Sequence, residues 1–306
     1  MKYREADISV IIPLYNHEQY VISALESVFQ QSVRPREVIV VDDGSSDQSF
    51  ELVRENFGDQ KNLVLWSKPN AGAHHTINAG IHRATSSNVA ILNSDDIYEP
   101  ERMQICLDIL DKDKESDMVC TGISFIDGSG CKIRNDWYRQ ALDYYLAHDD
   151  LALSLINGNF LMTTSNFVIR RSAFEKYGYF GNFRYTHDLA FLLRMLAQKG
   201  TIHVDPRPLL QYRIHGSNTI SEGVLKVKVE LAAVVAEYIL QLYRSDSGRL
   251  DPEYLEKLYE VLDAHNLSRM LFPLMGAMAV SECNGGGVDK ILADANVSTI
   301  LLTIAK

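Results

Sequence analysis

Two short stretches decide the fold: residues 8–14 read ISVIIPL and residues 38–44 read VIVVDDG. Each is an almost continuous apolar run, which is typical of a strand buried on both faces of a sheet. Between them, Ile22, Leu25 and Val28 are spaced as one face of a helix. A strand, a helix and a second buried strand in this order predict a parallel sheet with helices on both faces.

The same alternation continues along the chain to about residue 214. Apolar runs predict further strands at 63–66, 89–92, 118–126, 167–169 and 209–214, and helical spacing predicts helices at 17–31, 47–57, 73–83, 100–110 and 189–198. Residues 134–160 show no clear period.

The sequence pattern changes from alternating strands and helices to helices alone at residue 224. Three successive helices are expected at 224–244, 252–264 and 267–283, before a break at residues 285–287 (GGG). We therefore expect an α/β domain over residues 1–220 and a helical region over residues 221–306.

Composition argues against several classes of protein. The 306 residues carry a formal net charge of −10, whereas a nucleic-acid-binding protein normally has a basic surplus. No run of about 20 apolar residues predicts a transmembrane helix, and no basic segment before an apolar core marks a secretory signal. The four scattered cysteines have no CxxC spacing, which indicates reduced thiols. We expect a cytoplasmic protein that needs local cations or a metal to bind an anionic substrate.

Polar residues follow three of the predicted strands, at the edge where parallel sheets bind ligands. Asp42 and Asp43 end one strand, Asp95 and Asp96 follow another, and residues 13–16 (PLYN) end the first. Taken alone, the first pair also fits a helix-entry turn, and the second pair a solvated helix cap. Two adjacent like charges after a buried strand are costly, however. A divalent cation such as Mg²⁺ or Mn²⁺ would offset that cost and bridge to a diphosphate.

The order of these motifs resembles glycosyltransferase family 2. The resemblance is carried by residues 10–16 (VIIPLYN), 41–47 (VDDGSSD), 70–72 (NAG), 92–96 (LNSDD), 186–189 (THDL) and 212–218 (YRIHGSN). Each motif is short, and it is the ordered set, spanning residues 7 to about 220, that is specific. The resemblance implies a GT-A fold, which is a Rossmann-like, mostly parallel sheet flanked by helices. It also implies transfer of a sugar from a nucleotide donor with inversion.

The resemblance assigns roles to individual residues. The nucleotide-sugar would be bound by Pro13, Tyr15, Asn16, Asp43, Asn70, Gly72, Asn78 and Asp95, with Asp43 at the base, most commonly uracil. Asp95 and Asp96 would form the DXD-type carboxylate pair, with Asp96 as the direct ligand of Mn²⁺ or Mg²⁺. His215 would complete the metal shell, and Asp188 would be the general base.

The chemistry of inverting transfer supports a single base independently of the family. The attacking hydroxyl loses its proton as it displaces a nucleoside diphosphate, so one carboxylate is sufficient. A metal would stabilise the leaving group. Read alone, Asp188 is also an ordinary acidic residue of a first helical turn, and His215 is also an ordinary hydrogen-bonded loop residue.

Two stretches depart from the family pattern. Residues 73–80 read AHHTINAG where the family often has Ala-Arg-Asn, so the cation near the diphosphate is missing or is replaced by Lys68, His74 or His75. Joint metal binding by the two histidines is disfavoured, because adjacent helical side chains diverge by about 100°. Residues 86–88 (SSN) replace the usual Gly-Glu. These departures bear on the identity of the donor more than on the reaction class.

Partner surfaces are expected in two places. The aromatic residues of the acceptor-side segment could contact a sugar ring or serve as core packing; they are Trp137, Tyr138, Tyr144 and Tyr145. Helix 224–244 carries an apolar stripe that could dock on the main domain, form a homodimer or contact a membrane surface.

The sequence therefore predicts a metal-dependent inverting glycosyltransferase, cytoplasmic or at the inner face of the membrane, with a saccharide or lipid-linked saccharide acceptor. Two alternatives stay open. A nucleotidyltransferase that makes nucleotide sugars would need a glycine-rich basic loop after the first strand, where residues 14–18 read LYNHE. A non-catalytic protein would bind a nucleotide sugar or glycan without transferring it.

Overall fold

The computed structural model of the chain describes residues 5–216, 218, 223–245, 250–283 and 288–305. These residues group into two compact units. The first lies within Met1–Arg134, Leu161–Phe180 and Thr201–His215, and the second within Asn135–Phe160, Gly181–Gly200 and Gly216–Lys306. This division differs from a boundary at residue 220, because two earlier segments group with the C-terminal helices. The assignment of residues 1–220 and 221–306 as separate domains stays a prediction.

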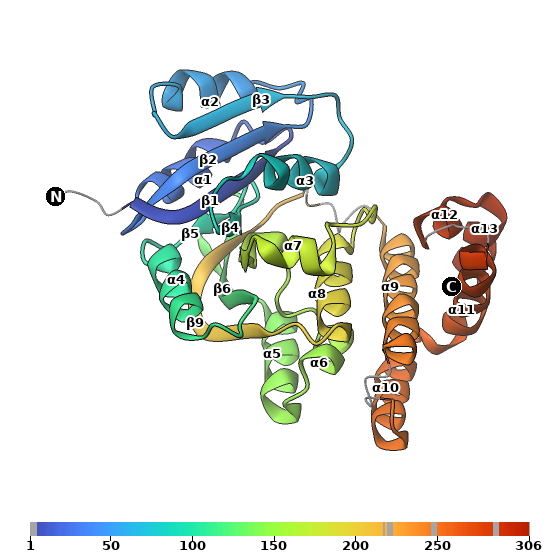
Figure 1. The fold of residues 1–306 in the computed structure, drawn as a ribbon. Helices are drawn as coiled ribbons and strands as arrows, with labels where there is room; N and C mark the ends of the chain where they lie inside the picture. Colours follow the sequence, from blue (N-terminus) through green and yellow to red (C-terminus); the bar gives the residue numbers. More distant parts are fainter. Residues whose placement is uncertain (1–4, 217, 219–222, 246–249, 284–287, 306) are drawn as a thin grey trace. The chain divides into compact units, whose positions relative to one another are not determined.

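The first unit is built on one mixed sheet (Figure 1). Among the described residues its strands are β1 (Glu5–Leu14), β2 (Arg34–Asp42), β3 (Leu63–Ser67), β4 (Asn88–Ile91), β5 (Ile97–Tyr98), β6 (Met118–Asp127), β7 (Lys132–Ile133), β8 (Val168–Arg170) and β9 (Ile202–Ile214). Their order is β3-β2-β1-β4-β8-β6-β9-β5, and β7 pairs with β6. The longer strands all run in one direction, and the reversed strands β5, β7 and β8 have only two or three residues each. The predicted mostly parallel sheet is confirmed.

The central strands are buried as their apolar sequences predict. Val10, Ile11 and Ile12 of β1 are fully buried, and so are residues 38–41 of β2. The helices of this unit are α1 (Val21–Phe29), α2 (Ser49–Phe57), α3 (Ala73–Arg83), α4 (Arg102–Lys112) and α7 (Ser172–Tyr177). Helix α3 packs on β1 and β2, and α4 packs on β6. Because β1, β2, β4 and β9 run in the same direction, their polar carboxyl ends lie at the same edge of the sheet.

The second unit is helical. Its described helices are α5 (Asp136–His148), α6 (Leu151–Asn157), α8 (His187–Ala197), α9 (Val224–Arg244), α10 (Pro252–Ala264), α11 (Ser268–Cys283), α12 (Val288–Ala293) and α13 (Ala295–Ile304). The helices expected at 224–244, 252–264 and 267–283 are confirmed to within one residue, while the expected break at residues 285–287 lies outside the described residues. The apolar stripe of α9 packs within this unit, against α8 and α11.

Residues 134–160 form two helices that periodicity does not reveal. Each helix begins at a capping side chain: Asn135 accepts a hydrogen bond from the N–H of Tyr138 (3.0 Å), and Asp150 accepts one from the N–H of Leu153 (2.9 Å). The caps were the usable local signal, since the many polar and aromatic residues of α5 weaken its apolar stripe.

No helix in the described part of the chain combines the length and the apolar character needed to cross a membrane.

Close packing of α3 on β1 yields a stability prediction. A Cβ added at Gly80 would lie 2.5 Å from Cγ2 of Ile11, whose side chain is fully buried. Gly80→Ala is therefore expected to lower the free energy of unfolding by about 1–3 kcal/mol, as measured by urea denaturation followed by circular dichroism.

The matched control is Gly276→Ala in α11, where an added Cβ meets nothing within 4 Å. Alanine is preferred over glycine inside helices by about 0.5–1 kcal/mol, so this variant should be neutral or slightly more stable. Equal stability of both variants would contradict the close contact between α3 and β1.

Candidate active site

The carboxylate of Asp43 anchors the loop that follows β3. Its Oδ1 accepts a hydrogen bond from the N–H of Ala71 (2.9 Å) and pairs with the ammonium group of Lys68. Its Oδ2 accepts a hydrogen bond from the N–H of Gly72 (2.9 Å), a residue with φ of +93° that favours glycine. Two predicted nucleotide-binding residues thus lie in direct contact, with the exposed Asn70 in the same loop. Lys68, a candidate for the missing cation, is paired with Asp43.

The segment after β1 is tied to the segment after β2. Oδ1 of Asn16 accepts a hydrogen bond from the N–H of Ser46 (2.8 Å), and the Asn16 N–H donates to Oγ of Ser45 (3.0 Å). Asn16 has φ of +50°, a conformation that asparagine tolerates better than most residues. Pro13 lies in the paired part of β1, and Tyr15 is 47% exposed. Residues 13–16 therefore lie at the same edge of the sheet as the end of β2.

Asn78 lies on α3 and makes contacts of a different kind. Its Nδ2 donates to the carbonyl oxygen of Phe180 (2.9 Å), and its Oδ1 accepts from the Phe180 N–H (3.1 Å). The amide therefore fixes the backbone after α7, and the donor contact expected of Asn78 stays a prediction.

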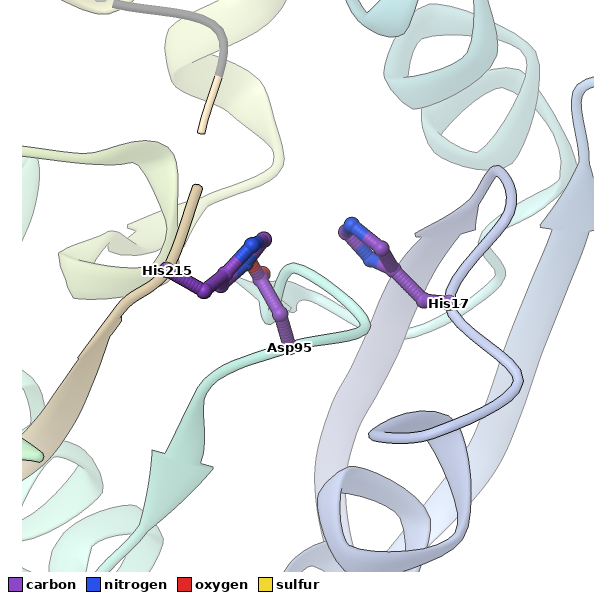
Figure 2. Close-up of side chains that lie close together, drawn as sticks. All are labelled: His17, Asp95 and His215. Atoms are coloured by element: carbon purple, nitrogen blue, oxygen red, sulfur yellow. The ribbon is translucent and has the colours of Figure 1, made fainter. Parts of the chain in front are cut away.

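Three side chains from separate segments extend into the same space (Figure 2): His17 after β1, Asp95 after β4 and His215 after β9. Nε2 of His215 lies 3.0 Å from Oδ2 of Asp95. One ligand atom from each of the three residues lies within 4.8 Å of the others. Nδ1 of His17 lies 2.7 Å from Oγ of Ser94. In the tautomer whose Nδ1–H donates to this oxygen, Nε2 of His17 presents its lone pair.

The protonation states of Asp95 and His17 suit metal ligands. Burial by itself would raise the pKa of Asp95, but the hydrogen bond from His215 and the nearby His17 lower that pKa below its ordinary value. Burial lowers the pKa of His17 and keeps its imidazole neutral. Metal ligands must be deprotonated carboxylates and neutral imidazoles, so both groups are in the required form.

The distances also fit a divalent ion. Bonds of about 2.0–2.3 Å place the ligand atoms around one ion about 3–4.5 Å apart. The Asp95–His215 separation of 3.0 Å already meets this requirement, and His17 needs only a small adjustment, because all three ligand atoms lie within 4.8 Å of one another.

Asp96 belongs to the framework of the same site. It is fully buried, its Oδ1 accepts a hydrogen bond from the N–H of Arg213 (2.9 Å), and its Oδ2 accepts one from Oγ of Ser165 (2.6 Å). Burial and the adjacent Asp95 charge raise the pKa of Asp96 well above its ordinary value. The structure thus brings Asp95, rather than Asp96, to His215. The direct metal contact expected of Asp96 stays a prediction.

His17 is absent from the candidates predicted from the sequence. A single histidine after an apolar strand carries no pattern of its own, and its neighbours in the cluster are distant along the chain. The usable signal was its position directly after Asn16, at the carboxyl end of β1, where the parallel register places it beside the loops of the neighbouring strands.

The predicted base, Asp188, lies in the first turn of α8 in the second unit. It is 7% exposed, and its Oδ2 accepts a hydrogen bond from Nδ2 of Asn159 (3.0 Å). Burial raises the pKa of Asp188 to about 6, although backbone N–H groups and Asn159 act in the opposite direction. A carboxylate with this pKa is ionised at neutral pH and can still accept a proton readily, as a general base must.

Asp188 and the histidine–aspartate cluster belong to different compact units. Their convergence on one cleft with Asp43 therefore stays a prediction.

The aromatic residues of α5 divide into two groups. Tyr138 is buried, and Tyr145 stacks on Phe160 with a centroid distance of 4.6 Å. Tyr144 stacks on His148 at 4.0 Å, and Trp137 is exposed. Packing thus accounts for Tyr138 and Tyr145, while a sugar contact by Trp137 stays a prediction.

The sequence is similar to those of known glycosyltransferases. The family model described as glycosyl transferase family 2 matches residues 9–178. An uncharacterized glycosyltransferase of Rickettsia typhi is 28% identical over 246 residues, which cover 78% of this chain and 73% of the relative. One from Rickettsia prowazekii is 30% identical over 224 residues, covering 71% and 67%. A chondroitin synthase of Pasteurella multocida is 32% identical over 130 residues, covering 42% of this chain but 14% of the synthase.

Solved structures share the fold. The crystal structure of S. aureus TarS 1-349 in complex with UDP has a TM-score of 0.61 at 21% identity and covers 84% of this chain and 71% of that one. The complex of TarS 1-349 with UDP-GlcNAc has a TM-score of 0.59 at 17% identity, covering 97% and 90%. This likeness confirms the predicted GT-A architecture.

The buried Asp188 carboxylate should reduce stability at neutral pH. The ordinary pKa of an aspartate is 3.8, and that of folded Asp188 is about 6. Between these values the folded state binds more protons than the unfolded state, so stability falls as pH rises. Asp188→Asn is expected to be more stable than the wild type at pH 8, by about 1–3 kcal/mol, and this difference should vanish near pH 4.

Urea denaturation at pH 4 to 8 measures this effect, with Asp59→Asn at an exposed position as the control. A pH-independent difference between Asp188→Asn and the wild type would contradict the raised pKa.

Proposed function

Since the chain belongs to glycosyltransferase family 2, we propose that it transfers a sugar from a nucleoside-diphosphate donor, with inversion, to a saccharide or lipid-linked saccharide. The observation that carries the proposal is the grouping of His17, Asp95 and His215 at the carboxyl edge of the parallel strands. This edge is where open α/β sheets bind ligands.

Asp188 acts as the general base in this proposal. As the acceptor oxygen forms a bond to the anomeric carbon, the bond from that carbon to the donor diphosphate breaks, and the hydroxyl proton moves to the Asp188 carboxylate. The support is its burial, its pKa of about 6 and the hydrogen bond from Asn159, which orients Oδ2.

Asp95, His215 and His17 would hold a divalent ion. Two imidazoles with one carboxylate favour a transition-metal ion such as Mn²⁺ over Mg²⁺, which prefers oxygen ligands. When bound, the ion would stabilise negative charge on the departing diphosphate. Such an ion would also allow a chain of net charge −10 to bind an anionic donor.

The donor is proposed to be a UDP-sugar. The TarS structures of similar fold are complexes with UDP and UDP-GlcNAc. In this chain Asp43, Asn16 and Gly72 would bind the nucleotide, because the loops after β1, β2 and β3 are joined by their hydrogen bonds. Asp43 would accept a hydrogen bond from the imide of uracil.

The acceptor is proposed to be a growing glycan, since similar proteins include chondroitin and hyaluronan synthases. Family membership favours transfer over the nucleotidyltransferase and non-catalytic alternatives. A cytoplasmic location, a homodimer and a peripheral membrane contact stay predictions.

A donor screen tests the proposed reaction. Purified protein with Mn²⁺, nucleotide sugars and saccharide acceptors should release nucleoside diphosphate, and UDP-sugars should give the strongest signal. Asp188→Asn should reduce this release by about 10²-fold or more without weakening donor binding. In the wild type the rate should fall below about pH 6, as Asp188 becomes protonated. Full activity of the variant would exclude Asp188 as the base.

Metal binding is tested separately from transfer. Calorimetric titration of metal-stripped protein with Mn²⁺ should show one site, and His17→Gln, Asp95→Asn and His215→Gln should each weaken it by about tenfold or more. Asp59→Asn, which changes an exposed carboxylate in the same unit, is the control. Wild-type Mn²⁺ affinity in all three site variants would exclude this ligand set.

A further inference from the structure

Glu230 of α9 binds the segment that leads into α8. Its Oε1 accepts a hydrogen bond from the N–H of Arg184 (3.0 Å). Its Oε2 accepts hydrogen bonds from the N–H groups of Tyr185 (2.8 Å) and Thr186 (3.1 Å), and from Oγ1 of Thr186 (3.2 Å). Three successive backbone N–H groups that converge on one anion form a nest. Here the anion is a side chain of the protein itself.

This contact takes the place of an ordinary helix cap. Thr186 stands at the N-cap position of α8, but its side chain makes no capping hydrogen bond to the helix. Instead, its hydroxyl donates to Glu230, while its carbonyl accepts the first helical hydrogen bond, from the N–H of Ala190 (2.8 Å). The start of α8 is therefore fixed from outside the helix, by a carboxylate on α9.

Asp188 lies two residues after Thr186, so the position of the Thr186 backbone determines the position of Asp188. Its carboxylate is held from one side by Asn159, at 3.0 Å, and its backbone is held by the first turn of α8. If residues 184–186 shifted by about 1 Å, Asp188 would move with them, and a displacement of this size can cost about 10²-fold in rate.

We propose that Glu230 is a positioning residue for the base Asp188, an inference that rests on the proposed function. Glu230 acts through the backbone of residues 184–186 and does not contact the substrate.

The charge of Glu230 should affect the pH dependence of the reaction, which a purely structural contact would leave unchanged. Glu230 is a charged neighbour that raises the pKa of Asp188, after the larger effect of burial. Asn159, which also contacts Asp188, is neutral, and burial lowers the pKa of the adjacent His187 to about 4. Removing the Glu230 charge should therefore lower the pKa of Asp188.

The experiment compares Glu230→Gln, Glu230→Asp and the wild type in the nucleoside-diphosphate release assay. Glutamine offers one acceptor oxygen instead of two and carries no charge. We expect Glu230→Gln to lower kcat by about tenfold or more, to leave KM for the donor unchanged and to move the acid limb of the kcat profile to lower pH. Glu230→Asp keeps the charge and both oxygens, and should recover part of kcat and the wild-type acid limb.

Glu256→Gln, an exposed carboxylate on α10, is the matched control and should behave as wild type. Thermal unfolding of each variant identifies any loss of folded protein. If Glu230→Gln has a lower Tm but an unchanged kcat and an unchanged acid limb, the inference is overturned. The proposed function would still stand in that case, provided that Asp188→Asn is inactive. Wild-type transfer by Asp188→Asn would overturn both.

Discussion

The site of the first unit depends on two adjacent buried carboxylates that have different hydrogen-bond partners and different pKa shifts. Asp95 and Asp96 cannot both carry a charge in an apolar environment without compensation. Hydrogen bonds from Arg213 and Ser165 hold Asp96 in the framework, where its pKa is raised, while Asp95 faces two imidazoles, which lower its pKa. This arrangement joins the end of β4 to the end of β9 and creates the only three-residue metal-type cluster found among the described residues.

The second unit uses hydrogen bonding to place another carboxylate. Asp188 is buried at the start of α8, where desolvation raises its pKa, and that desolvation would destabilise the fold without compensating contacts. Asn159 donates to its side chain, and Glu230 fixes the backbone before it. The proposed base is thus held in a form that accepts a proton readily, at some cost in stability, as is common for functional sites.

An acidic chain can bind the proposed anionic donor if a metal ion supplies the positive charge that the donor needs. Lys68, the cation nearest to the predicted nucleotide site in sequence, is paired with Asp43. Family membership establishes glycosyl transfer as the activity. The proposed metal site at His17, Asp95 and His215 would give that activity a testable chemical basis in this chain.

The sequence by itself determined the parallel core, the C-terminal helices and the positions of Asp43, Asp95 and His215 at strand ends, because apolar periodicity and the direction of parallel strands are local properties. It did not predict helices α5 and α6, because polar and aromatic residues weaken the apolar stripe of α5, and α6 has only seven residues, most of them buried. Only the tertiary structure shows that His215 contacts Asp95 and not Asp96, and that His17 lies beside them. The physical reason is distance along the chain: Asp95 and His215 are 120 residues apart, and no local pattern specifies which side chains meet when β4 and β9 come together in the sheet.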